Sequence, residues 1–252
     1  MNPSCRIAAF FDLDGTLLAP PSLERRFVRY LLPRGALGPA QTWCWLARFL
    51  RFVARDFEAA ALANKSYLAG IPLRLALEWA ATPEPKALPF HEEGLQRLLW
   101  HAEQEHRIYV VSGTLAPLAR IIAGHLPAPV EICATELASA RGCWTGELAG
   151  NWISGEAKAR AIARIAFENG IDLRQCFAYG DRMADAAMLQ LVGHPVAVNP
   201  SRRLESLARR RGWPIVKWRK IVPAPEIRCS MLPASAPPAR GTLIAQALRG
   251  HR

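Results

Sequence analysis

Short apolar runs alternate with amphipathic segments over residues 91–216, and this alternation constrains the fold more than any other feature. The runs predicted to be strands are 108–111, 130–133, 176–179, 196–198 and 215–216, and the predicted helices are 91–105, 115–125, 156–168, 184–191 and 202–211. A hairpin is predicted for 136–140 and 144–148. An earlier apolar run, 7–11, also ends abruptly in polar residues. The pattern predicts a doubly wound, Rossmann-like α/β fold with a mostly parallel sheet and helices on both faces.

Residues 20–85 have a different character. Apolar residues recur there at three- and four-residue spacings, without strand-like alternation. Ser22 is a candidate N-cap, and the Thr-Pro-Glu-Pro run at 82–85 closes the segment. We therefore predict a small all-helical cap over 20–85, inserted into an α/β core formed by 1–19 and 86–222.

The positive charge is concentrated at one end of the chain. The net charge is +11, yet residues 1–200 hold 20 Lys and Arg against 19 Asp and Glu, whereas residues 201–252 hold 12 against 2. The segment 223–252 is rich in Pro, Ala and Arg and is predicted to be a flexible basic tail. Because the remainder is nearly neutral, we expect no nucleic-acid partner.

The cysteines and the chain start indicate the cellular compartment. Six cysteines occur without a C-x-x-C pair, which argues against zinc and favours a reducing environment. Residues 1–11 lack the long apolar core of a signal peptide. The most apolar later stretch, 43–53, is too short to span a bilayer. The sequence therefore predicts a cytoplasmic protein without a transmembrane segment.

Aromatic and basic residues recur together in the predicted cap. They are Trp43, Trp45, Phe49, Phe52, Arg48, Arg51 and Arg55. Helical spacing of apolar residues is first a sign of burial, so we interpret the aromatic residues as the buried side of a cap helix. The alternative is weak contact with a membrane surface or a lipid-like substrate.

Four polar motifs follow predicted strands or open predicted helices that could face one edge of the sheet. They are Asp12-Leu13-Asp14-Gly15-Thr16, Val111-Ser112-Gly113-Thr114, Lys158 and Gly180-Asp181-Arg182-Met183-Ala184-Asp185. Two carboxylates two residues apart in a strand-end loop can both reach one phosphate, one as nucleophile and the other as general acid and base. Asp-Gly alone often caps a turn, and a lone helical lysine is usually solvated. The order of all four motifs favours the chemical interpretation.

Together the motifs resemble the haloacid dehalogenase superfamily, above all its phosphoserine-phosphatase-like branch, which has a helical cap between the first and second motifs. The likeness spans about residues 7–218 and includes the Gly-His-Pro-Val-Ala-Val-Asn-Pro run at 193–200. It implies that Asp12 becomes phosphorylated and that Asp14 acts as general acid and base.

The resemblance also implies a Mg²⁺ site. Its ligands would be the Asp12 side chain, the Asp14 backbone carbonyl and the Asp181 side chain, with Asp185 supporting the metal or its waters. An oxygen-rich site next to a phosphate suits this ion.

The phosphate would be held by three groups from two of the motifs. Ser112 and the backbone N–H of Gly113 would donate hydrogen bonds, and Lys158 would supply a positive charge. The positive end of a helix beginning near Thr114 would add to them.

The expected function is Mg²⁺-dependent hydrolysis of a small phosphorylated metabolite, such as a phosphorylated amino acid, an amino alcohol phosphate or histidinol phosphate. One alternative is phosphoryl transfer through the same intermediate, and another is action on a lipid-like or membrane-associated phosphate ester. Dehalogenation is disfavoured because it needs neither an acid at Asp14 nor Mg²⁺. A phosphate-binding module without catalysis is disfavoured by the complete set of carboxylates.

Three positions depart from the family's pattern. Arg182 stands where relatives usually have Ser or Gly, and Thr114 replaces the second glycine of a Ser-Gly-Gly motif. Pro21 stands nine residues after Asp12, where we expect phosphoserine phosphatases to carry a substrate-recognising glutamate. The resemblance therefore extends to catalysis but not to phosphoserine as the substrate.

Overall fold

A computed structural model describes residues 7–52 and 63–224, and its centre is a six-stranded sheet with the order β4-β3-β1-β7-β8-β9. All neighbouring strands in it are parallel. The strands are β1 (Ala8–Phe11), β3 (Arg107–Leu115), β4 (Glu131–Thr135), β7 (Phe177–Gly180), β8 (His194–Val198) and β9 (Ile215–Val216). The predicted doubly wound α/β fold is confirmed.

Strand β1 lies in the middle of the sheet and is buried on both faces. Ala8 and Phe10 belong to one apolar cluster, and Ala9 and Phe11 belong to the other. Side chains alternate along a strand, so a continuous apolar run is what such a position requires. The run also carries the chain directly to the carboxyl edge at Asp12.

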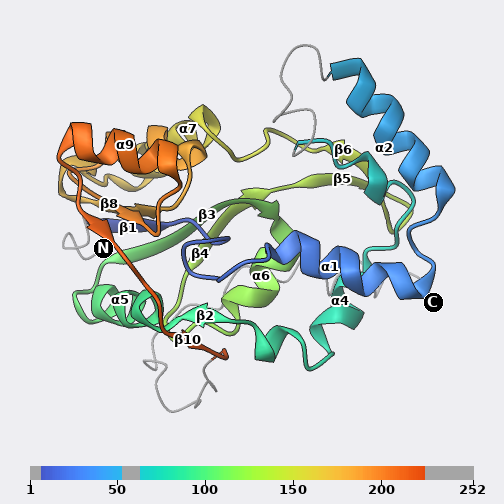
Figure 1. Ribbon diagram of the computed structural model, residues 1–252, viewed down its shortest axis with the longest axis horizontal. Coiled ribbons are helices and arrows are strands. Elements are labelled where there is room, and N and C mark those ends of the chain that lie inside the picture. The colour runs from blue at the N-terminus through green and yellow to red at the C-terminus, as the bar shows by residue number, and fades with distance from the viewer. Residues whose placement is uncertain (1–6, 53–62, 225–252) are drawn as a thin grey trace.

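Helices cover both faces of the sheet (Figure 1). One face packs against α5 (Glu92–Glu103) and α6 (Ala116–Ala123). The other packs against α7 (Glu156–Asn169), α8 (Ala186–Leu191) and α9 (Arg202–Arg211). The short 3₁₀ turns η4 (Leu173–Gln175) and η5 (Met183–Asp185) flank β7. The predicted helix at 184–191 is thus split into η5 and α8.

Between β1 and α5, the described residues form helical elements and the short strand β2 (Phe90–His91). The helical elements are α1 (Leu23–Leu31), η1 (Leu32–Arg34), α2 (Pro39–Phe52), η2 (Ser66–Leu68), α4 (Arg74–Ala80) and η3 (Pro85–Ala87). The Ser22 hydroxyl accepts from the backbone N–H of Arg25 at 3.5 Å, so the predicted N-cap is confirmed. The helical character agrees with the predicted cap, whose boundaries and separate-domain status stay predictions.

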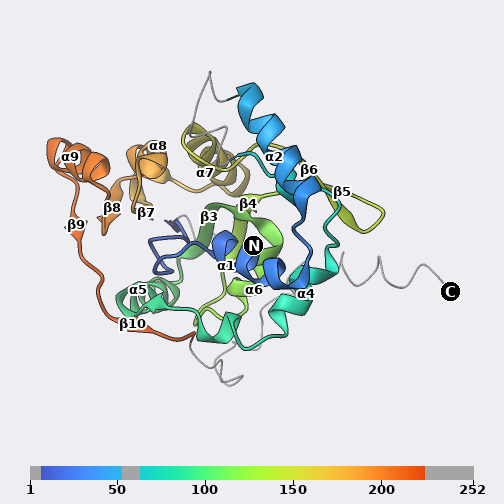
Figure 2. The ribbon, with the colours of Figure 1, turned by 45° about the vertical axis from the view of Figure 1, so that its right-hand side comes forward.

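The predicted hairpin is present as β5 (Leu137–Ala140) and β6 (Cys143–Leu148), and it lies beside the helical insertion (Figure 2). The backbone N–H of Gly70 donates to the carbonyl of Trp144 at 2.8 Å, and the N–H of Trp144 donates to the carbonyl of Ile71 at 3.0 Å. The buried Trp144 ring also meets Phe27 of α1 edge-on. The hairpin is therefore part of the surface on which the insertion rests.

The helix predicted to begin near Thr114 is present as α6, which begins two residues later, at Ala116. β3 continues through Ser112, Gly113 and Thr114, because Ser112 pairs with Ala134 and Leu115 pairs with Thr135 across a register shift. Proline lies in the first turn of α6, where a missing N–H costs nothing. The motif therefore lies in extended backbone directly before the helix.

The interpretation of the aromatic stripe as a buried face is wrong for Trp43. Its side chain is 69% exposed, whereas Trp45 and Phe49 are half-buried and stack with ring centroids 5.0 Å apart. Residues two positions apart on a helix point to nearly opposite sides, so one helix face cannot bury both Trp43 and Trp45. The Phe52 and Arg51 side chains and all of Arg55 lie outside the described residues.

Two further elements complete the described chain. A small antiparallel pair joins β2 to β10 (Ile221–Val222), which the sequence did not predict. The predicted tail lies outside the described residues except for 223–224. Within the described ranges, no helix is both long enough and apolar enough to cross a bilayer.

A buried histidine pair lies beneath the sheet on the α5 side. His101 is completely buried, with its Nδ1 2.9 Å from Nδ1 of His106 and its Nε2 2.9 Å from the hydroxyl of Tyr179 on β7. Burial, together with the charges of His106 and Arg97, lowers the pKa of His101 to about 3. His101 therefore stays neutral in the folded protein over most of the acidic range.

Acidification is expected to destabilise the protein through His101. In the unfolded chain its pKa returns to about 6.5, so between about pH 6.5 and 3 the unfolded state binds more protons. The free energy of unfolding falls over this window by up to about 1.4 kcal/mol per pH unit from this group. Denaturant unfolding at pH 7 and pH 5 checks it: His101→Phe should lose less stability on acidification than wild type, and the exposed His194→Asn should behave like wild type. An unchanged loss in His101→Phe would refute the assignment.

Candidate active site

The first motif follows β1 directly. Asp12 is buried, and its backbone N–H donates to the carbonyl of Tyr179 at 2.9 Å, which continues the pairing of β1 with β7 beyond the end of the strand. The side chain is thereby held at the carboxyl edge of the sheet, between the ends of β3 and β7. This is the edge at which doubly wound sheets bind ligands.

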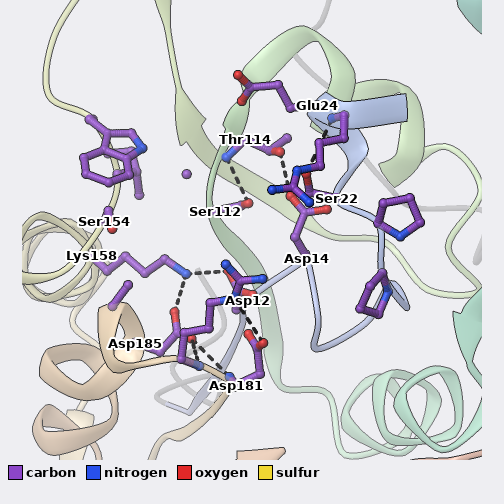
Figure 3. Close-up of a pocket in the computed structure, with 18 of the residues that line it drawn as sticks. Asp12, Asp14, Ser22, Glu24, Ser112, Thr114, Ser154, Lys158, Asp181 and Asp185 are labelled. Atoms are coloured by element: carbon purple, nitrogen blue, oxygen red, sulfur yellow. Dashed lines mark hydrogen bonds and ion pairs between the residues drawn. The ribbon is translucent and has the colours of Figure 1, made fainter. Parts of the chain in front are cut away.

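Lys158 reaches the same point from the first turn of α7. Its Nζ lies 2.5 Å from Oδ1 of Asp12 and 2.6 Å from Oδ1 of Asp185, and the side chain is 3% exposed (Figure 3). These two ion pairs more than offset the cost of burial and raise the pKa of Lys158. The lysine is thus a fixed positive charge beside Asp12.

The fourth motif forms a tight turn after β7. Oδ2 of Asp185 accepts from the backbone N–H groups of Asp181 at 3.1 Å and of Arg182 at 2.9 Å. Residues 181–182 precede the 3₁₀ turn η5, so Asp181 and Asp185 do not lie on one face of a helix. Asp185 instead folds back and fixes the loop that carries Asp181.

The acidic side chains at this point form a cluster. One carboxylate oxygen from each of Asp12, Asp181 and Asp185 lies within 4.8 Å of the others. Burial, with the charges of Asp185 and Asp181 adding, raises the pKa of Asp12, although Lys158 opposes the shift. Burial and Asp185 raise the pKa of Asp181 to about 7. The buried Lys158 and the exposed Arg182, whose Nε lies 3.5 Å from Oδ2 of Asp181, face three carboxylates.

The cluster fits a divalent cation. Oδ1 of Asp181 is buried and has no hydrogen-bond partner among the described residues, and an unsatisfied buried carboxylate oxygen is costly unless something binds it. The oxygens of Asp185 already accept from Lys158 and from two backbone N–H groups. Asp185 is therefore suited to a supporting position, whereas Asp12 and Asp181 have oxygens to offer a hard cation.

Asp14 points to a different part of the site. Its Oδ1 accepts from the backbone N–H of Leu23 and its Oδ2 from the hydroxyl of Thr114, each at 2.7 Å. Burial raises the pKa of Asp14 despite these two hydrogen bonds. A raised pKa favours the protonated form, which is the form that a proton donor needs.

The second motif lies across the pocket from Lys158. Ser112 is 1% exposed and, with Gly113, lines a pocket of about 210 Å³ that also contains Asp12, Asp14 and Lys158. The Ser112 hydroxyl oxygen accepts from the backbone N–H of Thr114 at 3.2 Å, which leaves its own O–H available as a donor. The seven residues predicted for the site thus line one pocket.

Several pocket residues belong to none of the four motifs. Glu24, Arg25 and Lys65 come from the helical insertion, and Trp152 and Ser154 come from the segment before α7. Their placement depends on chain packing, and no motif marks them. Thr114 departs from the Ser-Gly-Gly motif of the family, and its hydroxyl donates the hydrogen bond that orients Asp14.

Gly15 leaves room for Asp181. Its φ is +98°, and a Cβ built on it would lie 2.3 Å from Oδ2 of Asp181. A non-glycine residue there would be strained and would also push the Asp181 carboxylate aside. The absence of a side chain at Gly15 thus allows the Asp181 carboxylate of the fourth motif to lie against the backbone of the first.

Gly15→Ala is expected to destabilise the protein by about 1–3 kcal/mol and to weaken the binding of divalent cations. Gly212→Ala is the matched control: Gly212 has φ +69° with no atom within 4 Å of the built Cβ, so it carries backbone strain alone. Denaturant unfolding and Mg²⁺ titration of both variants check this. Equal stability losses and unaltered Mg²⁺ binding in Gly15→Ala would contradict the role.

Comparisons with known proteins agree with this arrangement. The model of the haloacid dehalogenase-like hydrolases matches residues 9–190. Phosphoserine phosphatase SerB1 of Mycobacterium tuberculosis (strain ATCC 25618 / H37Rv) is 32% identical over 224 residues, which cover 84% of this chain and 71% of SerB1.

Two solved structures have a similar fold. A protein of Bordetella pertussis Tohama I has a TM-score of 0.68 at 24% identity, over 84% of this chain and 99% of that one. A phosphoserine phosphatase with a phospho-aspartyl intermediate analogue has a TM-score of 0.60 at 19% identity, over 86% and 94% of the two chains.

Proposed function

The chain belongs to the haloacid dehalogenase-like hydrolase family, and we propose that it hydrolyses a small phosphate monoester through a covalent aspartyl-phosphate on Asp12. One observation carries the proposal: the carboxylate of Asp12 lies 2.5 Å from Nζ of Lys158 in a pocket that Asp14, Ser112 and Gly113 also line. The phosphatase name of SerB1, a relative at 32% identity, supports the same class of reaction.

In the first step the Asp12 carboxylate attacks phosphorus and the bond to the leaving oxygen breaks. Asp14 gives that oxygen its proton, so the product leaves as an alcohol. The raised pKa of Asp14 supports this role, because the acid must be protonated when the substrate binds. The hydrogen bond from Thr114 and the one from the backbone of Leu23 hold the carboxyl group in position.

In the second step water attacks the phosphorus of the aspartyl-phosphate. Asp14, now a carboxylate, takes the proton from the water, and the bond from phosphorus to Asp12 breaks to release inorganic phosphate. Lys158, the Ser112 hydroxyl and the Gly113 N–H hold the phosphoryl oxygens in both steps. Such fixed donors stabilise developing charge without reorganising at the moment of reaction.

Mg²⁺ fits the acidic cluster and would be held by the Asp12 side chain, the Asp14 backbone carbonyl and the Asp181 side chain. When bound, it would neutralise the charge that phosphate adds to the three carboxylates. Asp185 would keep the Asp181 loop in place through its two backbone hydrogen bonds.

The proposal is tested by measuring inorganic phosphate release from a panel of monoesters, with Mg²⁺ and with EDTA. We expect turnover with Mg²⁺ and a loss of at least about 100-fold in EDTA, since the ion is asked to supply several kcal/mol. Restoring Mg²⁺ should restore the rate. Full activity in EDTA would remove Mg²⁺ from the proposal, and no phosphate release from any monoester would refute the proposed function.

A further inference from the structure

The pocket has a second set of charged side chains, beyond those assigned to the reaction. They are Glu24, Arg25, Lys65 and Arg182, which all line the pocket. Three of these side chains are cationic and one is anionic, so the net charge that they offer a substrate depends on which of them are already paired. Their partners therefore indicate which leaving groups the pocket could accept.

Glu24 is already paired within the protein. Both of its carboxylate oxygens accept from Nζ of Lys65, at 2.7 and 2.6 Å, and Oε1 also accepts from the hydroxyl of Tyr67. Burial and the Glu24 charge raise the pKa of Tyr67, so the phenol stays a donor. Figure 3 shows the Glu24 side chain directed away from Asp14. Glu24 and Lys65 together contribute a neutral pair.

Arg25 follows Glu24 on α1 and is exposed at the pocket. Within residues 7–52 and 63–224, no carboxylate lies within 4 Å of its guanidinium, whereas Lys65 is fully engaged by Glu24. A guanidinium without a protein partner presents several N–H donors in a plane that matches a carboxylate or a phosphate. Arg25 thus offers an unpaired positive charge.

Arg182 approaches from the other side of the pocket. Its side chain is 62% exposed, and its only ion pair in the described part of the chain joins Nε to Oδ2 of Asp181 at 3.5 Å. That leaves the terminal guanidinium nitrogens without a carboxylate partner. Arg182 is the residue that departs from the family's Ser or Gly, and it adds a second cation to the pocket.

We propose that the substrate's leaving group carries its own negative charge and no ammonium group, and that Arg25 and Arg182 bind it. The proposal rests on the proposed phosphatase function and names its substrate class. An ammonium group would meet the guanidinium of Arg25 and the terminal guanidinium nitrogens of Arg182, which have no carboxylate partner among the described residues. Glu24, the pocket carboxylate outside the reaction centre, is held by Lys65 and Tyr67. Like-charge contacts of this kind exclude a ligand as effectively as good contacts select one.

Two matched pairs of monoesters test the substrate class. Phosphoserine and 3-phosphoglycerate differ only in having an ammonium or a hydroxyl group on one carbon. The leaving groups of phosphoethanolamine and phosphoglycolate carry an ammonium and a carboxylate, respectively. The reference is p-nitrophenyl phosphate, whose leaving group has no carboxylate and no ammonium. We expect kcat/KM for 3-phosphoglycerate to exceed that for phosphoserine, and kcat/KM for phosphoglycolate to exceed that for phosphoethanolamine, by about tenfold or more.

Variants assign this preference to residues. In Arg25→Ala and Arg182→Ala, the ratio of kcat/KM for 3-phosphoglycerate to that for p-nitrophenyl phosphate should fall about tenfold, mainly through KM. Arg74→Ala, which removes an exposed arginine of α4 outside the pocket, should keep the wild-type ratio. Thermal unfolding confirms that each variant is folded.

The outcomes separate this proposal from the proposed function. Turnover of p-nitrophenyl phosphate with a preference for phosphoserine or phosphoethanolamine would overturn the substrate class and leave the phosphatase intact. Unchanged ratios in both arginine variants would overturn the assignment to these residues. A protein that releases phosphate from none of the five esters would overturn both.

Discussion

Asp12→Asn is expected to lower kcat by roughly 10⁴-fold or more, the scale on which removal of a covalent nucleophile acts in other hydrolases. The amide has the size of the carboxylate but cannot form the acyl-phosphate. Residual turnover would come from the remaining donors and from substrate binding. The measurement is steady-state phosphate release with p-nitrophenyl phosphate at saturating Mg²⁺.

The fold should survive this substitution. Burial and the neighbouring carboxylates already raise the pKa of Asp12, so a neutral side chain relieves repulsion within the cluster. Asp172→Asn is the control, because Asp172 is the N-cap of the 3₁₀ turn η4, does not line the pocket and pairs with the exposed Arg174. We expect Asp172→Asn to retain parental activity. An Asp12→Asn variant with parental kcat would exclude Asp12 as the nucleophile.

Lys158→Met is expected to have two large effects. It leaves Asp12 and Asp185 buried without their shared cation, and breaking a buried pair of this kind costs about 3–5 kcal/mol of stability. It also removes a fixed positive charge from the phosphoryl oxygens, for which we expect a loss of roughly 10²–10³-fold in kcat/KM. Denaturant unfolding in EDTA and steady-state kinetics with Mg²⁺ measure the two effects separately.

The exposed Lys86 supplies the control for Lys158. Lys86→Met changes the net charge equally but removes no buried ion pair, so stability and kcat/KM should stay near the parental values. A Lys158→Met variant as stable and as active as Lys86→Met would show that the lysine neither balances the acidic cluster nor binds phosphate.

The sheet and the convergence of the four motifs on one pocket could be predicted because their signals are local. The apolar run before Asp12 must become a central strand once it is buried on both faces, and parallel strands deliver their following residues to one edge. Each motif is then a few residues long and needs only its own strand or helix to be placed. Lys158 is the exception, since only its order in the chain marked it.

The features that the sequence did not reveal depend on contacts between distant residues. The partner of Glu24 is Lys65, 41 positions away, and the partner of His101 is Tyr179, 78 positions away. Neither pair leaves a pattern in either segment alone. The extension of β3 through Thr114 has a similar origin, because the strand is prolonged by pairing with β4, which a local turn signal does not report.

The central claim is that the side chain of Asp12 is transiently phosphorylated, and the most direct measurement is mass spectrometry after an acid quench. The Asp14→Asn variant with p-nitrophenyl phosphate should accumulate the intermediate, because nitrophenolate leaves without a proton whereas the attacking water still needs a base. We predict one added phosphoryl group on the peptide that contains residue 12, and none in the Asp12→Asn, Asp14→Asn double variant. A phosphoryl group on another residue, or release of nitrophenolate by the double variant at the rate of Asp14→Asn, would contradict the claim.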